Sequence, residues 1–368
     1  MDTSHSPASS TNARPVLFIG LDGAKPDLLK RWMDSGELPV FARLRRNGIC
    51  EDVQTFRGFG DGAVWPSLLT GLNPARHGRY FRSQLRPRSY RHKLFSVDSD
   101  LMGEPFWTTL GKAGRRVAVL DVPFAPLQHD INGVLLIDWL IHDRYGAPRS
   151  WPPEFVDDVL SRLGDDPIGG NSDVLPKDGA SLARLSDLLN RRVTMKESLV
   201  SETVRSTRWD MVATVFTEAH DLGHVGWHLR DPSHPQHDPV WLKQHGDPIK
   251  RLYMETDRAI GRILANARPD TAVVVFAGLG MGPDYTANGV MEQILARLEQ
   301  RPFKRTVGLS RRLKAAGLPE GVARIGQKFD TVRNSLAISR RRFLTLQTDV
   351  GHSIESGSRS FWTACASR

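Results

Sequence analysis

Two groups of polar side chains in this 368-residue chain have the types and spacing that metal-assisted chemistry needs. Asp22 ends a short apolar run, Val16–Asp22, and a glycine follows it. His220 and His224 lie four residues apart, so on a helical turn they share one face and can bind one cation together. A mixed set of carboxylate and imidazole suits zinc, with manganese as the alternative, and such an ion can polarise a phosphoryl oxygen. These residues therefore predict a divalent-metal site.

Each of these signals also has a purely structural interpretation. A lone aspartate at a strand end can start a turn or cap the next helix, and a helical histidine pair can belong to an ordinary core. Clustering favours chemistry, because six of the twelve histidines lie between positions 220 and 245, with Glu218 and Asp221 beside them. Clustered histidines are typical of metal binding or proton transfer.

Three apolar runs that predict buried strands end next to candidate residues. In a parallel sheet the carboxyl ends of the strands lie at one edge, where ligands bind, so we expect these three ends to meet. The runs are Val16–Asp22, which ends in Asp22; Trp209–Phe216, which precedes the His220 and His224 pair; and Thr271–Phe276, which precedes the glycine-rich loop at Gly278.

Strands and helices alternate along most of the chain. This alternation predicts an α/β fold with a doubly wound, mostly parallel sheet and helices on both faces. Tyr80–Asp100 is polar and is expected to be irregular, whereas the long, charged, amphipathic stretch Gly179–Thr207 is expected to be a surface helix. Further strands are expected at Cys50–Phe56, Arg116–Val122 and Gly133–Trp139, and further helices at Lys25–Gly36, Leu38–Asn47, Val64–Thr70, Glu104–Gly114, Pro153–Leu163, Pro248–Ala267 and Gly289–Glu299.

Composition sets limits on the class of protein. The apolar fraction of 40% is typical of a globular protein, and no stretch approaches the about 18 apolar residues that a membrane span needs. Residues 1–14 are polar and lack the apolar stretch of a secretory signal, so we expect a disordered arm there. Cys50 and Cys365 are the only cysteines, which predicts no disulfide framework and favours a cytoplasmic setting.

The net charge of +9 is concentrated late in the chain. Between Arg301 and Arg342 there are twelve lysines and arginines against Glu320 and Asp330. Such a segment attracts phosphate, anionic lipid or nucleic acid, but a solvated helical face is the simpler interpretation. It carries no nucleic-acid-binding motif. We predict an α/β domain at 15–300, a basic helical segment at 301–342 and a short C-terminal part at 343–368.

Four motifs occur in a characteristic order: GLDGA at Gly20–Ala24, WPSLLTGLNPARHG at Trp65–Gly78, FTEAHDLGHVGW at Phe216–Trp227 and METDRAIGRIL at Met254–Leu264. From about residue 15 to residue 300 the chain thereby resembles the type I phosphodiesterase/nucleotide pyrophosphatase branch of the alkaline phosphatase superfamily. The resemblance implies an alkaline phosphatase-like fold. It also implies a hydrolase that acts on a small-molecule phosphoester through two metal ions, usually zinc.

The resemblance gives individual positions a role. Asp22 matches the metal-binding aspartate of the first strand. Four residues before Trp65, where the family has a threonine or serine nucleophile, this chain has Asp61. Asp61 could be the nucleophile and form an acyl phosphate, or it could be a metal ligand. By spacing, the nearby Ser67 and Thr70 lie along the following helix and are interpreted as structural.

After the segment Phe-Thr-Glu, the family has a metal-binding aspartate and, four residues later, a histidine. Those positions hold His220 and His224 here, so the resemblance implies that both are metal ligands. Asp221 is the competing ligand if the loop is shifted by one residue. The family's C-terminal metal-binding histidine has His352, after Gly351, as its only candidate.

The chain departs from the family pattern after the late strand. Where the family has Ser-Asp-His-Gly, with a second metal-binding pair, this chain has Ala277–Gly280, and neither Gly278 nor Leu279 can bind a metal through its side chain. Asp22 and Asp61 then remain as the main candidates to hold a second ion. The family also continues well past position 352, so the resemblance implies a shortened C-terminal part.

These departures leave two function classes open. The first is a metal-dependent hydrolase of phosphoesters. The second is a catalytically impaired relative that keeps the fold and binds an anionic or phosphorylated ligand. A metal-dependent isomerase or sulfatase of the same superfamily is less favoured, because the chain has no Cys-x-Pro-x-Arg sequence for a sulfatase-type nucleophile.

Overall fold

The computed structural model describes residues 14–56, 59, 61–142, 144, 146–169, 178–206, 209–283, 294, 297 and 360–362. The chain divides into two units, one formed by Met1–Asp284 with Ile354–Arg368 and the other by Tyr285–Ser353. All helices and strands below belong to the first unit. The basic segment 301–342 and most of the predicted arm, of the predicted helix Gly289–Glu299 and of 343–368 lie outside the described residues. The domain boundaries inferred from the sequence stay predictions.

A six-stranded sheet with the order β7-β6-β5-β8-β1-β9 forms the centre of this unit. All neighbours pair in parallel except β7, which is an antiparallel edge strand. Leu21 lies opposite Phe216, and Gly20 lies opposite Phe276, so the carboxyl ends of β1, β8 and β9 are level at one edge. The strands are β1 (Val16–Leu21), β5 (Val117–Leu120), β6 (Gly133–Ile137), β7 (Arg149–Trp151), β8 (Met211–Phe216) and β9 (Ala272–Phe276).

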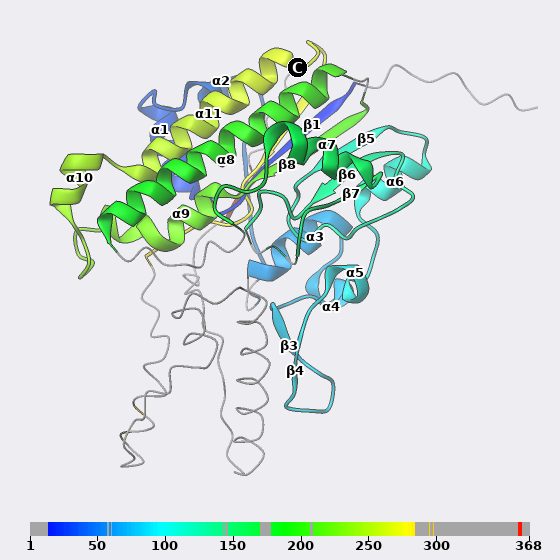
Figure 1. Cartoon of the computed structure of the whole chain (residues 1–368), viewed down its shortest axis with the longest axis horizontal. Helices are drawn as coiled ribbons and strands as arrows, with labels where there is room; N and C mark the ends of the chain where they lie inside the picture. The colour runs from blue at the N-terminus through cyan, green and yellow to red at the C-terminus, as the bar shows by residue number, and fades with distance from the viewer. Residues whose placement is uncertain are drawn as a thin grey trace, which may run out of the picture. The chain divides into compact units, whose positions relative to one another are not determined.

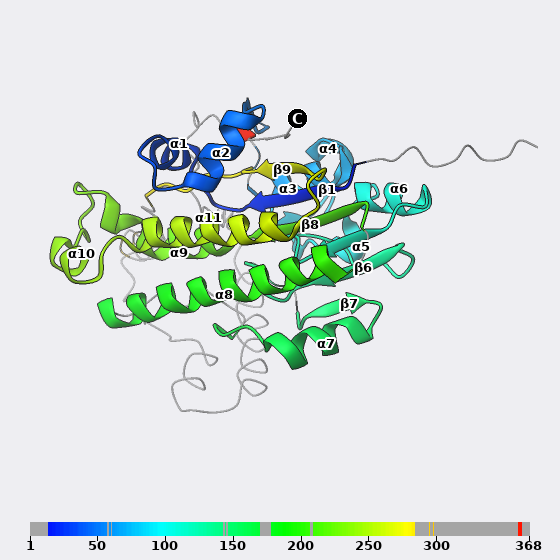
Figure 2. The same ribbon diagram turned by 90° about the horizontal axis from the view of Figure 1, so that it is seen from above.

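Helices cover both faces of this sheet, and α8 and α11 run side by side along one of them (Figures 1 and 2). Because successive side chains of a strand point to opposite faces, Leu17 and Ile19 belong to one core and Phe18 to the other. The predicted doubly wound α/β fold is therefore confirmed. The first core includes α1 (Pro26–Asp34), α2 (Pro39–Asn47), α7 (Glu154–Leu163), α8 (Gly179–Ser206), α9 (Glu218–Gly226) and α11 (Pro248–Asn266), and the second includes α3 (Val64–Thr70) and α6 (Phe106–Lys112).

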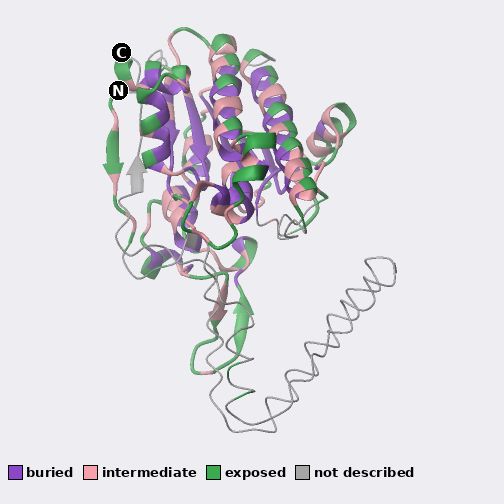
Figure 3. Cartoon of the chain, turned by 90° about the vertical axis from the view of Figure 1, so that its left-hand side faces the viewer, coloured by how far each residue is buried: buried purple, intermediate pink, exposed green. Residues whose placement is uncertain are grey.

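A hairpin of two short strands, β3 (Ser83–Leu85) and β4 (His92–Leu94), interrupts the segment expected to be irregular. That expectation was wrong here, because three-residue strands without apolar alternation leave no periodic signal. The hairpin is largely exposed, in contrast to the buried strands of the central sheet (Figure 3). The other short elements are β2 (Glu51–Val53), η1 (Asp61–Ala63), α4 (Pro74–His77), α5 (Val97–Asp100), η2 (Trp227–Arg230), α10 (Pro239–His245) and β10 (Ser360–Trp362), which pairs antiparallel with β2.

Side-chain caps followed by proline start several helices. The carboxylate of Asp247 accepts the Lys250 N–H at 3.0 Å to begin α11, and Asn73 accepts the Arg76 N–H at 3.1 Å to begin α4. Proline at the next position fits the first helical turn, where its missing N–H costs nothing. Across the described part of the chain, none of the helices combines the length and the apolar character needed to cross a bilayer.

Gly23 allows the end of β1 to approach α9 closely. Its φ of +69° lies in the left-handed region, and a Cβ at this position would lie 2.4 Å from the Cα of His220. Any larger residue would push α9 away from the strand end, so this glycine sets the distance between Asp22 and His220.

We predict that Gly23→Ala lowers the free energy of unfolding by about 2–5 kcal/mol, since left-handed strain and overpacking add. Gly36→Ala is the matched control, because Gly36 also has a positive φ (+82°) but a Cβ added there would meet no atom within 4 Å. It should cost only about 1–2 kcal/mol. Urea unfolding of both variants measures the difference. Equal losses would show that the close approach at Gly23 contributes nothing.

Candidate metal centre

Three imidazoles lie together at the carboxyl edge of the sheet. One ring nitrogen each from His142, His220 and His224 lies within 4.8 Å of the other two. The rings of His142 and His220 stack with their centroids 4.0 Å apart, and the rings of His220 and His224 are 4.7 Å apart. His142 and His220 are buried, and His224 is half-buried. Within the described residues, this is the group of potential ligands close enough to hold one cation.

Asp22 and His220 meet as the sequence predicted. His220 comes from the first turn of α9, and its Nδ1 lies 2.6 Å from Oδ2 of Asp22, at the end of β1. The indole Nε1 of Trp65 donates to Oδ1 of Asp22 at 2.8 Å. Burial alone would raise the pKa of Asp22, but the charge and hydrogen bond of His220 and the bond from Trp65 hold this pKa below its ordinary value of 3.8. Asp22 is therefore a carboxylate at neutral pH.

His142 was missed by the sequence analysis. It follows β6, and its Nδ1 lies 2.6 Å from Oδ1 of Asp221, while its backbone N–H donates to Thr217 Oγ1 at 3.0 Å. Upstream, the carboxylate of Asp121 accepts the N–H groups of Trp139 and Leu140 at 2.9 and 2.7 Å. The signal was present, because the predicted strand Gly133–Trp139 ends shortly before this histidine, just as other strands end near candidate ligands.

Asp221 lies behind His142 rather than within the three-imidazole group. Its second oxygen, Oδ2, accepts a hydrogen bond from Arg192 of α8 at 2.7 Å, and Arg192 also binds Asp166 through Nε at 2.7 Å. All three side chains are buried. Arg192 and Asp221 thus hold the His142 ring at its Nδ1 atom, and the ligand role that the sequence left open for Asp221 stays a prediction.

Lys196, one helical turn beyond Arg192, ties the same strand ends together. Its buried Nζ donates to the carbonyl of Val215 at 2.7 Å and lies 3.2 Å from Oδ2 of Asp121 and 3.5 Å from Oε1 of Glu218. Glu218 is buried, and neither of its carboxylate oxygens accepts a hydrogen bond from the described residues. Burial therefore raises the pKa of Glu218, although Lys196 and Arg192 oppose this shift.

The backbone next to Asp61, the predicted nucleophile, accepts a hydrogen bond from a buried arginine. Asp61 begins η1. The structure describes its backbone but not its side chain. The next carbonyl, that of Gly62, accepts a 2.7 Å hydrogen bond from the Nε of buried Arg79. The guanidinium of Arg79 lies 4.1 Å from the ring centroid of Phe124. Arg79 therefore fixes the backbone next to Asp61.

Ser67 and Thr70 have the structural contacts expected from their place on α3. Thr70 Oγ1 donates to the carbonyl of Pro66 at 2.7 Å. The Arg79 N–H donates to Nδ1 of His77 at 3.1 Å, so the ring proton is on Nε2, 2.9 Å from Ser67 Oγ. Burial and the nearby Arg79 charge lower the pKa of His77. A neutral imidazole that donates to Ser67 cannot take its proton, so this pair is not a nucleophile and base.

The remaining candidate positions add no ligand to the described site. After β9, a Cβ on buried Gly278 would lie 2.5 Å from Cζ of Phe276 and 2.8 Å from Cγ1 of Val64. His352 lies outside the described residues. The metal-binding roles predicted for Asp22, Asp61, His220, His224 and His352 stay predictions. The structure brings Asp22, His220 and His224 together.

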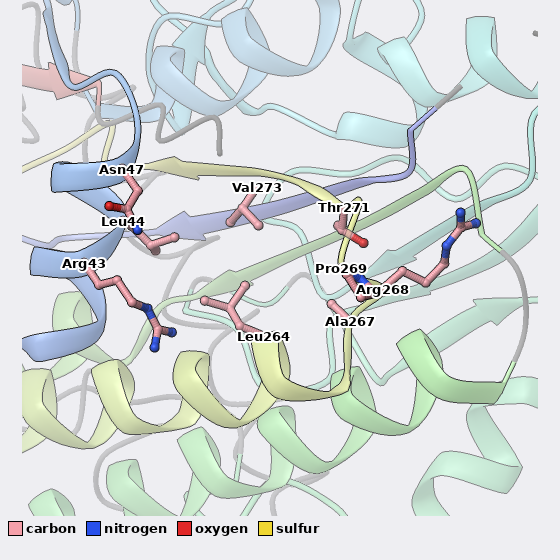
Figure 4. Close-up of a pocket in the computed structure, with 9 residues that line it drawn as sticks. All are labelled: Arg43, Leu44, Asn47, Leu264, Ala267, Arg268, Pro269, Thr271 and Val273. Atoms are coloured by element: carbon pink, nitrogen blue, oxygen red, sulfur yellow. The ribbon is translucent and has the colours of Figure 1, made fainter. Parts of the chain in front are cut away.

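A pocket of about 210 Å³ lies elsewhere, at the beginning of β9 (Figure 4). Thr271 and Val273 line it from the amino end of that strand, whereas the three imidazoles lie at the carboxyl edge of the sheet. None of the candidate ligands lines this pocket. Its remaining lining residues are Arg43, Leu44, Asn47, Leu264, Ala267, Arg268 and Pro269.

Comparison with known families matches residues 16–335 to the profile described as type I phosphodiesterase/nucleotide pyrophosphatase. The chain belongs to this family. The resemblance found from the four motifs is thereby confirmed, and the family supports the prediction of a phosphoester hydrolase. A search of curated protein sequences found no match.

One solved structure supports the fold. Phosphonoacetate hydrolase from Sinorhizobium meliloti 1021, in complex with phosphonoformate, matches with a TM-score of 0.51 and 19% identity over 78% of this chain and 63% of that chain. Murine ectonucleotide pyrophosphatase/phosphodiesterase 5 matches with a TM-score of 0.44 and 14% identity, over 73% and 57% of the two chains. The chain thus covers less than two thirds of the length of each of these two proteins. At 19% identity, the first match supports an alkaline phosphatase-like fold.

We predict that Glu218→Gln becomes more stable relative to the wild type as the pH rises. The pKa of Glu218 in the folded protein lies above its ordinary value of 4.5, so the folded state retains a proton that the unfolded chain releases. This stabilising contribution is complete below pH 4.5 and is lost as the pH rises through the folded-state pKa. Glutamine does not titrate, so the free energy of unfolding of the variant does not fall with the loss of this proton, whereas that of the wild type does.

Urea unfolding from acidic to neutral pH, with a chelator present, measures this difference. Glu51→Gln is the control, because Glu51 is exposed on β2 and should follow the wild type. If Glu218→Gln instead becomes less stable relative to the wild type as the pH rises, the assignment is contradicted.

Proposed function

We propose that this family member is a metal-dependent hydrolase that acts on small-molecule phosphoesters. The observation that carries the proposal is the group of His142, His220 and His224, which lies beside Asp22 at the carboxyl edge of the sheet. In open α/β sheets this edge is where ligands bind. The family match supports the same chemistry independently.

The donor set fits a zinc ion. Zinc accepts imidazole nitrogens readily, and catalytic zinc sites commonly use three protein ligands and leave a position open. Two of the three rings have their Nδ1 held by buried carboxylates, His220 by Asp22 and His142 by Asp221. This arrangement fixes the ring orientation and makes Nε2 the ligand atom. The ion would polarise a phosphoryl oxygen; manganese is the alternative to zinc.

Asp61 occupies the nucleophile position, and we propose two alternatives for it. As a nucleophile, its carboxylate would attack phosphorus and expel one alcohol. Water would then hydrolyse the acyl phosphate to the free carboxylate and to phosphate from a monoester, or a phosphate monoester from a diester. As a ligand, it would contribute an oxygen to a cation instead. In both cases Arg79, through the carbonyl of Gly62, holds the backbone that presents Asp61.

A catalytically impaired relative that binds an anionic or phosphorylated ligand is the second candidate. Two observations favour it: position 61 has no hydroxyl, and Gly278 and Leu279 offer no ligand where the family has a metal-binding pair. The cytoplasmic setting expected from the sequence also stays a prediction.

We predict that the full chain, loaded with zinc or manganese, hydrolyses nitrophenyl phosphate mono- or diesters. His142→Ala and Asp61→Ala should each lower kcat/KM by at least about 100-fold, because losing a ligand or nucleophile costs more than losing an outer partner of the site. Phosphonoacetate belongs in the same screen because of the shared fold with its hydrolase. His245→Ala, an exposed histidine at the end of α10, is the matched control and should leave kcat/KM unchanged.

Acid quenching of a single turnover with phosphorus-labelled ester separates the two roles of Asp61. Label on the wild-type protein, absent from Asp61→Asn, identifies the nucleophile, whereas turnover without label identifies a ligand. Binding of inorganic phosphate without turnover of any ester would favour the impaired relative. If metal is absent and both alanine variants behave as the wild type, the hydrolase proposal fails.

A further inference from the structure

We infer that this centre holds one cation, bound by His142, His220 and His224, and that apolar side chains fill the place beside Asp22 where a second ion would lie. The inference rests on the proposed metal-dependent function, and it concerns how many ions that function uses. The family resemblance implied two ions, so the chain would differ from its relatives in the centre itself.

The ligands come from one side of β1. In the order β6-β5-β8-β1-β9, His142 follows β6, and His220 and His224 follow β8. On the other side of β1, β9 is followed by Ala277–Gly280, whose side chains include no metal ligand. A cation bound by the three imidazoles therefore lies on the β8 side of Asp22.

The β9 side is packed with apolar groups. The rings of Trp65 and Phe276 meet edge to face with centroids 5.5 Å apart, and both side chains are almost fully buried. Trp65 is seated on β1 so closely that a Cβ on Gly20 would lie 2.6 Å from its ring. Gly278 is similarly enclosed by Phe276 and Val64, at 2.5 and 2.8 Å from its missing Cβ. A carboxylate at position 278 would have to displace the Phe276 ring.

Both oxygens of Asp22 already accept hydrogen bonds. Oδ1 accepts from Trp65 Nε1 at 2.8 Å, and Oδ2 lies 2.6 Å from Nδ1 of His220. The indole N–H is a donor, so it occupies one of the two lone-pair positions of Oδ1 and competes there with a second cation. Asp22 therefore acts on the bound cation through His220, in the way that Asp221 acts through His142. The two carboxylates are positioning residues of a single centre.

The test combines metal analysis with X-ray absorption on the full-length, zinc-loaded protein. Elemental analysis should give about one zinc per chain, and the absorption spectrum should show imidazole nitrogens at about 2.0–2.1 Å. A second metal at about 3.5–4 Å, the separation in two-metal sites, should be missing from the spectrum. Neither measurement depends on activity.

Variants distinguish ligands from positioning residues. His142→Ala should lose the zinc, whereas Asp22→Asn should bind one zinc at saturation with about 10–100-fold weaker affinity, the usual cost of losing an outer-shell carboxylate. His245→Ala should keep the wild-type content and affinity. Gly278→Asp combined with Leu279→His should gain no second ion, because the packing leaves no room for the new carboxylate.

Two zinc ions per chain with a metal neighbour in the spectrum would overturn this inference and leave the proposed hydrolase intact. No zinc in the wild type would overturn both. One ion retained by His142→Ala and lost from Asp22→Asn would contradict the ligand assignment. A folded Gly278→Asp, Leu279→His variant that gains a second ion would contradict the packing argument, and if that variant does not fold, the wild-type spectrum decides alone.

Discussion

Two buried cations of α8, Arg192 and Lys196, are the constraint on which the site depends. They lie one helical turn apart, and each joins segments distant in sequence. Arg192 binds Asp221 of α9 and Asp166, which follows α7, whereas Lys196 binds the Val215 carbonyl of β8 and approaches Asp121, which follows β5. Removing such charges from water costs several kcal/mol per ion unless they are paired. The pairing is complete only when the ends of β5, β6 and β8 lie where they bring His142 and His220 together.

The carboxylates near the imidazoles differ in whether they pair with a buried cation of α8. Asp221 and Asp121 face buried cations of α8, so their charge is largely compensated. Asp22 receives its hydrogen bonds from Trp65 and His220, and its lowered pKa keeps it ionised. Asp22 thus supplies negative charge next to the imidazoles. Through its hydrogen bond to His220, the Asp22 carboxylate would offset part of the charge of a divalent cation bound by that ring. The same bond makes the imidazole a stronger ligand.

Strand ends were predictable from the sequence, and buried ion pairs were not. The runs ending at Asp22 and before His220 are short, apolar and bounded by turns, and the rule that parallel strands end at one edge then brought these residues together. Applied to the strand before His142, the rule would have found that residue too. The helix carrying Arg192 and Lys196 was expected on the surface because of its charge. Their partners come from loops distant in sequence, which local periodicity does not reveal.

A centre with one cation changes what the rest of the chain must supply. Two metal ions can stabilise the attacking and the leaving oxygen of a phosphoester together, whereas one ion can serve only part of that charge. In such a centre no second ion would assist, since apolar side chains enclose Gly278 and the indole of Trp65 donates to Asp22. The leaving oxygen would then depend on its own acidity or on a proton from the chain. The proposed centre would therefore favour esters with acidic leaving groups, which depart without that proton.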